Sequence, residues 1–202
     1  MSTKTIFKLQ LATDPSWVKN VVESNIEEIL TDHAYCEQKA ATNAITLIIQ
    51  NPNIAELVQQ MAQLVKEEME HFKRVHDIIL KRGYTLGVER KDNYVNELIK
   101  FLKRGGGEQK RTESMVDRLL LAAMIEARSC ERFKVMAQYI NDNELAQFYN
   151  ELMISEAGHY TLFIGLARKY GEGIDVEKRW QEWLDYEGEI IKNYATAEGI
   201  HG

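Results

Sequence analysis

Four stretches of this sequence carry an apolar residue at every third or fourth position, and in each of them glutamate or histidine interrupts the apolar series. Steps of three and four are typical of the buried face of an amphipathic α-helix. In the stretch LVKEEMEHFKRVH, residues 64–76, both a glutamate and a histidine fall on that face. Ionisable side chains are therefore expected where the helices should contact their core. The ionisable residues of the four faces that we take as candidates are Glu37, Glu68, His71, Glu126, Glu156 and His159.

The composition favours helix over most of the chain. Only 2 prolines and 12 glycines interrupt the 202 residues, and a chain of this length can bury a substantial core. We therefore predict an all-α protein with a single domain over residues 1–202. We expect a short helix opened by Asp14 and Pro15, a long connection with one short helix that closes with glycines 105–107, and longer helices. The first longer helix should end near residue 50, and the second should span about 53–82. The third should start after Thr112 and reach about 140, and the fourth should follow it to about 170. A terminal helix is expected over about 176–196.

Buried carboxylates require compensation. An unpaired ionised carboxylate in a core costs several kcal/mol, and four of them would cancel a typical domain stability of about 5–15 kcal/mol. Four glutamates carry four negative charges and two neutral imidazoles carry none, so two divalent cations would balance the set. In a Glu-x-x-His motif the two side chains lie on the same helix face and can both face inward. The residues therefore predict a dinuclear metal site.

The spacing of the candidates argues against coincidence. Glu37, Glu68 and His71 each have a counterpart 88 or 89 residues later in the chain, and these counterparts are Glu126, Glu156 and His159. This spacing indicates a repeated helical hairpin. A third Glu-x-x-His match, at Glu198 and His201, lies in a tail next to glycines, and we interpret it as accidental.

Two neighbouring residues compete for a role in the site. Glu131 could replace Glu126, but it leaves the apolar face and lies five residues further on, about 7.5 Å along a helix. We expect Glu131 to pair with Arg128 or Arg132 on the exterior. His33, one turn before Glu37, is a candidate for supporting a ligand or lining the pocket.

The chain also has features of a cytoplasmic protein. It has 2 cysteines, no signal peptide and no apolar run near the roughly 20 residues of a membrane span. We expect a reduced, soluble chain without membrane contact. Its formal net charge of −6 at pH 7 would repel nucleic acid, so any such partner needs a local basic patch.

Four short strings resemble one enzyme family. They are DHAYCEQKAA around Glu37, EEMEHF around Glu68, IEARSCERF around Glu126 and SEAGHY around Glu156. One Glu and one Glu-x-x-His from each of two hairpins is the di-iron arrangement of ferritin-like four-helix bundles. The strings resemble more narrowly the tRNA 2-methylthio-isopentenyladenosine hydroxylases, known as MiaE, from the first helix to about Tyr170.

The resemblance implies a ferritin-like four-helix bundle built from two hairpins, with a crossover connection and extra terminal helices. It implies that Glu37 and Glu126 are terminal ligands, that Glu68 and Glu156 bridge two irons, and that His71 and His159 complete the coordination. The implied reaction inserts one oxygen atom from O2 into the prenyl group of a modified adenosine in tRNA. It requires an external electron donor, such as a reductase or a ferredoxin-like protein, and manganese could replace iron.

A tRNA partner requires positive charge near the site. The strongest candidates lie in the long connection, although they could equally belong to a solvated loop that merely carries charge. These candidates are Lys100, Lys103, Arg104, Lys110 and Arg111.

Three other classes of protein remain open. A ferritin-like iron store would share the ligands but needs a closed shell of many subunits. A rubrerythrin-type peroxidase normally carries a C-x-x-C module, which this sequence lacks. A helical scaffold without catalysis is possible if no metal binds. The oligomeric state is left open.

Overall fold

A computed structural model describes residues 6–103 and 108–193 of the chain, and these residues form six α-helices and one short π-helix. The described ranges contain no β-strand, so the predicted all-α class is confirmed. The contacts divide the chain into two compact units. One unit consists of residues 24–91, and the other joins residues 6–23 to the described residues from 92 to 193. Each unit is described separately.

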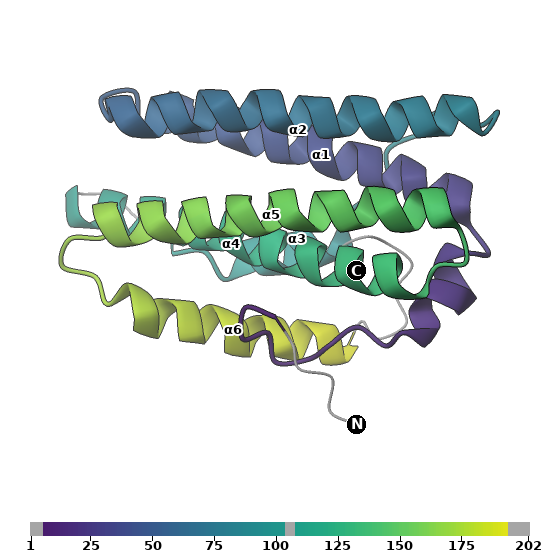
Figure 1. The fold of residues 1–202 in the computed structure, drawn as a ribbon. Helices are drawn as coiled ribbons and strands as arrows, with labels where there is room; N and C mark the ends of the chain where they lie inside the picture. Colours follow the sequence, from purple (N-terminus) through teal and green to yellow (C-terminus); the bar gives the residue numbers. More distant parts are fainter. Residues whose placement is uncertain (1–5, 104–107, 194–202) are drawn as a thin grey trace. The chain divides into compact units, whose positions relative to one another are not determined.

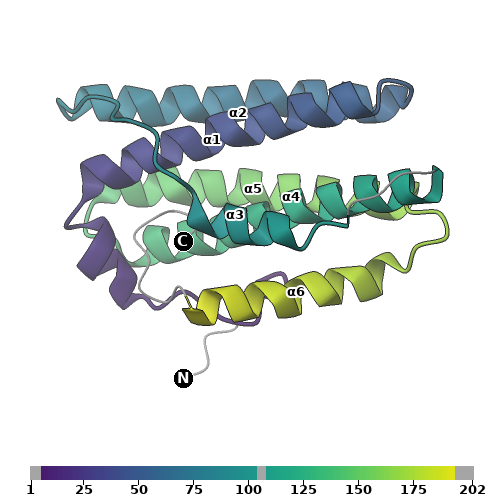
Figure 2. The same cartoon turned by 180° about the vertical axis from the view of Figure 1, so that it is seen from behind.

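The first unit is a helical hairpin. Helices α1 (Ile26–Gln50) and α2 (Ala55–Lys81) lie side by side and run in opposite directions (Figures 1 and 2). Pro52 falls in the turn between them. Helix α2 ends at Lys81, and the chain turns away at Gly83, whose φ of 75° is one that residues with a Cβ rarely adopt. The Tyr84 amide then donates to the Ile79 carbonyl at 3.0 Å, which satisfies a carbonyl of the last turn.

The second unit contains a second hairpin with additional elements. Helices α4 (Glu108–Tyr139) and α5 (Asn143–Tyr170) form the hairpin, and α6 (Val176–Asn193) follows it (Figure 1). The short helix α3 (Asn93–Lys100) contacts both α4 and α6, and the π-helix η1 (Val18–Val22) contacts α4. Helices α3 and α5 are preceded by the N-cap residues Asp92 and Asp142. The Asp92 carboxylate accepts the Val95 amide, and the Asp142 carboxylate accepts the Leu145 amide.

Helix α4 is buried on almost every side between residues 116 and 136. Its sequence from 119 to 127, LLLAAMIEA, is almost continuously apolar, as expected of a helix without a solvent face. Within this unit α6, α3 and the N-terminal segment contact the side of α4 that carries Arg128. The charged residues that follow the apolar run are therefore enclosed as well.

The element boundaries agree with the sequence-based expectations except at two places. Helix α4 begins at Glu108 instead of after Thr112, because residues 108–113 are mostly good helix formers that continue the helix toward the glycines. The short N-terminal helix is π-helical over residues 18–22. Its N-cap is Trp17 instead of the predicted Asp14, although the Asp14 carboxylate does accept the Ser16 amide at 2.8 Å just before the helix. The predicted end of the last helix at 196 lies outside the described residues, as does the motif at 198–201.

Candidate metal centre

The first unit brings together three potential metal ligands. Glu37 comes from α1, while Glu68 and His71 lie one turn apart on α2, and all three side chains are buried. Each residue offers a ligand atom within 4.8 Å of the others. The Nδ1 atom of His71 lies 3.5 Å from Oε2 of Glu68 and 3.9 Å from Oε2 of Glu37. The imidazole nitrogen thus faces the same point as both carboxylates.

The second unit repeats this arrangement. Glu126 comes from α4, Glu156 and His159 come from α5, and all three are buried. Their ligand atoms also lie within 4.8 Å of one another. The Nδ1 atom of His159 is 3.5 Å from Oε2 of Glu156, the same separation as in the other Glu-x-x-His pair. The repeat in the sequence therefore corresponds to a repeat in side-chain geometry.

The chemistry of each set fits a divalent cation. Two carboxylates and one neutral imidazole supply oxygen and nitrogen ligands and a charge that one divalent cation balances. Carboxylate and imidazole ligands are compatible with iron and manganese. Burial of carboxylates next to each other is unfavourable without a cation. Each unit consequently has the donor set that a metal ion requires.

His33 lies where the sequence suggested that it could support a ligand. It is fully buried, and its Nε2 atom is 2.6 Å from Oε1 of Glu37. The other carboxylate oxygen of Glu37 is the one near His71. A hydrogen bond of this kind fixes the orientation of a ligand carboxylate.

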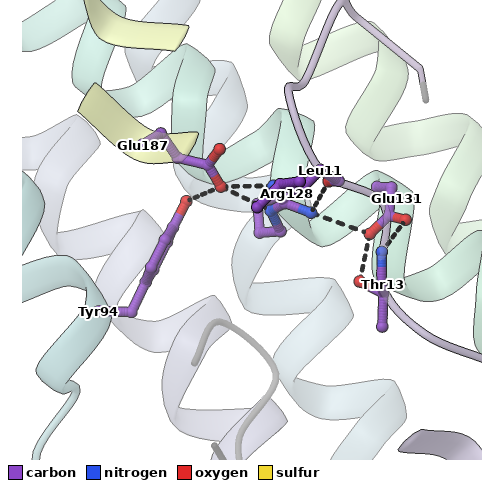
Figure 3. A network of polar contacts seen from close by, with 6 residues as sticks. All are labelled: Leu11, Thr13, Tyr94, Arg128, Glu131 and Glu187. Carbon is purple, nitrogen blue, oxygen red and sulfur yellow. Dashed lines mark hydrogen bonds and ion pairs between the residues drawn. The ribbon is translucent and has the colours of Figure 1, made fainter. Parts of the chain in front are cut away.

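The expectation that Glu131 lies on the exterior is wrong. Glu131 is buried with 4% of its surface exposed, and its carboxylate accepts hydrogen bonds from the amide and hydroxyl of Thr13 at 2.8 and 2.5 Å (Figure 3). The predicted pairing with Arg128 is present, with Nη1 and Oε2 3.2 Å apart. The N-terminal segment covers this side of α4, which the pattern of α4 alone could not indicate.

Sequence reasoning missed the buried polar cluster around Arg128. Its guanidinium contacts Glu187 of α6, and the Tyr94 hydroxyl of α3 contacts the same carboxylate (Figure 3). The partners lie 59 and 93 residues apart in the chain, so no local pattern connects them. The available signal was the apolar run that precedes Arg128, since a helix that is apolar all round is normally enclosed.

Cys130 lies on α4 and is buried in the core. Its thiol donates to the Met153 carbonyl at 3.2 Å. Burial, with smaller contributions from Glu156 and Glu131, raises the pKa of the thiol to about 12. The group is therefore a neutral thiol at physiological pH.

The proposed tRNA-binding residues are only partly described. Lys100 is exposed and pairs with Glu97 at 2.5 Å, and the side chains of Lys103 and Arg111 are exposed. Arg104 and the side chain of Lys110 lie outside the described residues.

The described part of the chain contains no helix long and apolar enough to span a membrane.

Residues 1–202 match the family model described as tRNA-(MS[2]IO[6]A)-hydroxylase (MiaE). Two curated relatives carry the name tRNA 2-(methylsulfanyl)-N(6)-isopentenyladenosine(37) hydroxylase. The relative from Pseudomonas putida is 33% identical over 166 residues, which cover 82% of this chain and 78% of the relative. The relative from Salmonella typhimurium is 25% identical over an alignment of 231 positions, gaps included, which covers 91% of this chain and 83% of the relative.

A solved structure has the same fold. It is described as Protein 43 with aldehyde deformylating oxygenase activity from Synechococcus, and the TM-score is 0.87 at 28% sequence identity. The match covers 98% of this chain and 96% of the other. This similarity confirms the predicted ferritin-like fold class.

Proposed function

We propose that this chain, which belongs to the MiaE family of tRNA hydroxylases, is a di-iron monooxygenase. Its substrate would be 2-methylthio-isopentenyladenosine in tRNA. The product would carry one hydroxyl group on the prenyl side chain. One observation supports the metal chemistry most directly: each unit holds a buried Glu and Glu-x-x-His set with ligand atoms within 4.8 Å of one another.

The proposed ligands divide evenly between the units. Two iron ions per chain would carry four positive charges, equal to the negative charge of the four glutamates. When bound, the irons supply the electrons that reductive cleavage of O2 requires, which zinc cannot do. The six proposed ligands are Glu37, Glu68, His71, Glu126, Glu156 and His159.

The protein's own residues prepare the site for this chemistry. Hydrogen bonding by His33 holds one oxygen of Glu37 and leaves the other oxygen directed toward His71. Burial of the ligands excludes bulk water, which strengthens their electrostatic interactions. An external electron donor is needed for each turnover, and a reductase or a ferredoxin-like protein would fill that role.

The substrate would be bound mainly through its phosphates. Lys103 and Arg111 are the exposed candidates on either side of residues 104–107, whereas Glu97 already neutralises part of the charge of Lys100. The modified base must leave its stack to reach buried ligands, as in other base-modifying enzymes. Binding through several phosphates should weaken steeply as salt increases.

One assay tests the proposal directly. Iron-loaded protein is incubated with O2, a reductant and tRNA that carries the unhydroxylated nucleoside, and the nucleosides are then analysed by mass spectrometry. We expect one added oxygen atom on the prenylated nucleoside. A variant with Lys103, Arg104, Lys110 and Arg111 changed to Glu should bind iron normally but lose tRNA binding. Unchanged tRNA modification by this variant would show that the binding surface lies elsewhere.

A second candidate function is an oxygenase that acts on a small molecule. The similarity to a structure described by its aldehyde deformylating oxygenase activity supports this alternative. The same assay distinguishes the two functions. Consumption of O2 and reductant without any oxygen added to the tRNA nucleoside would favour the small-molecule oxygenase.

A further inference from the structure

Arg128 joins three segments of the second unit at one buried guanidinium, namely α4, α6 and the N-terminal segment. Only 1% of its surface is exposed. Nε donates to Oε1 of Glu187 at 2.8 Å, and Nη2 lies 2.6 Å from the same oxygen. Nη1 donates to the Leu11 carbonyl at 3.0 Å and to Glu131 at 3.2 Å. Helix α4 is thereby connected to α6 and to the N-terminal segment (Figure 3).

The surrounding groups extend this connection. Tyr94 of α3 donates its hydroxyl to Glu187 at 3.3 Å, and Thr13 donates both its amide and its hydroxyl to Glu131. The guanidinium geometry suits such multiple contacts, because its donors are fixed in one plane. Lysine could retain the charge at this position but could not reproduce the fork.

The helical geometry relates this cluster to Glu126. Successive residues of an α-helix are separated by about 100°, so Arg128 projects about 200° from Glu126, on the opposite side of α4. A rotation of α4 by about 10° would move a side-chain end by about 1 Å, given a helix radius of roughly 5–6 Å. A metal ligand must be held within about 0.5 Å of its productive position. Contacts on the Arg128 side can therefore control where the Glu126 carboxylate lies.

We propose that Arg128 is a positioning residue for Glu126, fixing the local rotation of α4 over residues 126–131 through Glu187, Glu131 and the N-terminal segment. This inference rests on the proposed role of Glu126 as a metal ligand. Buried ion pairs add little net stability compared with apolar packing of the same volume, whereas they can specify one arrangement. A positioning role accounts for the buried charge better than a contribution to stability.

A second buried arginine provides a matched control. Arg179 of α6 donates to both oxygens of Asp117 at 2.8 and 2.7 Å and to the Phe101 carbonyl at 2.9 Å. Asp117 lies on α4 nine residues before Glu126, about 13.5 Å along the helix axis. Arg179→Lys therefore disturbs an equivalent buried contact of α4 far from the ligand. It reports what general destabilisation alone does to the metal centre.

The test compares Arg128→Lys with Arg179→Lys in the full chain. Anaerobic ferrous iron affinity is measured by competition with a chelator, the absorption spectrum of the iron-loaded protein is recorded, and unfolding is followed by circular dichroism. We expect both variants to melt at lower temperature. Only Arg128→Lys should bind iron about tenfold more weakly and change the spectrum, as happens when the support of a metal ligand is removed.

An iron affinity and a spectrum of Arg128→Lys that equal those of the wild type would overturn the positioning role. Equal changes in Arg128→Lys and Arg179→Lys would overturn it as well. If Arg128→Lys does not fold, Glu187→Ala takes its place, because it removes the carboxylate that holds Nε and Nη2 of Arg128. An unchanged iron affinity and spectrum in Glu187→Ala would then overturn the inference. Failure of the wild-type protein to bind iron would instead reject the proposed function, and this role with it.

Discussion

Tyr94 illustrates at the scale of one residue how strongly the core controls ionisation. Burial raises the pKa of its phenol well above the ordinary value of 10.0, and the Glu187 carboxylate adds to the shift. In the unfolded chain the phenol ionises near its ordinary pKa. The unfolded state therefore releases a proton above about pH 10 that the folded state retains, and the stability contributed by the neutral phenol decreases as pH rises.

Tyr94→Phe should separate these two effects. At pH 7 the variant loses the hydrogen bond to Glu187, and its free energy of unfolding should fall by about 0.5–1.5 kcal/mol. Above pH 10 the wild type loses the stability described above and the variant does not, so the difference should shrink. Urea unfolding at pH 7 and at pH 10.5 measures both values. A difference that stays constant between the two pH values would contradict the shifted pKa.

Glu126 and Glu131 provide a second test at this scale. Glu126→Ala removes a proposed ligand and should reduce the iron content per chain sharply. Glu131→Gln retains the shape of a side chain that contacts Thr13 and Arg128, so at saturating iron its metal content should equal that of the wild type. Iron analysis of anaerobically loaded proteins gives the comparison. Equal metal loss in both variants, or in neither, would reject the assignment of Glu126.

The two helical hairpins show what the sequence could predict at the scale of the elements. The periodicity of apolar residues predicted α1, α2, α4 and α5, because a buried face repeats every three or four positions. It also identified Glu68 and His71 as inward-facing. The burial of Glu131 was not predictable in this way, because Thr13 and the other covering groups come from segments distant in sequence. Periodicity describes one helix, whereas burial depends on all the elements around it.

Gly188 shows a further constraint that periodicity does not reveal. A Cβ atom at this position of α6 would lie 2.9 Å from Cβ of Gln10 in the N-terminal segment. Gly188→Ala should therefore displace that segment and lower the free energy of unfolding by about 1–3 kcal/mol. Gly165→Ala is the control, since no atom lies within 4 Å of its added Cβ.

We expect Gly165→Ala to raise stability by about 0.5–1 kcal/mol, because alanine is the better helix former. Chemical unfolding of both variants gives the comparison. Stabilisation by Gly188→Ala similar to that by Gly165→Ala would mean that the N-terminal segment does not pack closely against α6.

The proposed metal ions would change the charge balance of the whole molecule. The chain has a formal net charge of −6 at pH 7, and four of its glutamates are the buried proposed ligands. Without cations these carboxylates repel one another and lose hydration. Folding stability and metal binding should therefore be coupled in this protein.

Iron should accordingly raise the melting temperature at pH 7. A ligand present at about 100 times its Kd stabilises the native state by about 2.7 kcal/mol, which corresponds to roughly 5–10 °C for a chain of this size. Calorimetry of metal-free and anaerobically iron-loaded protein measures the shift, and Glu126→Ala should show a smaller one. Equal melting temperatures of the metal-free and loaded wild type would contradict the coupling.

The neutral state of the Cys130 thiol has a practical consequence for anyone who works with this protein. Thiolates, not thiols, are the species that react with alkylating reagents and oxidants. A thiol with a pKa of about 12 that is enclosed in the core presents very little thiolate at neutral pH. Native Cys130 should therefore resist iodoacetamide and air, so that protection of this residue during purification does not depend on reducing agents.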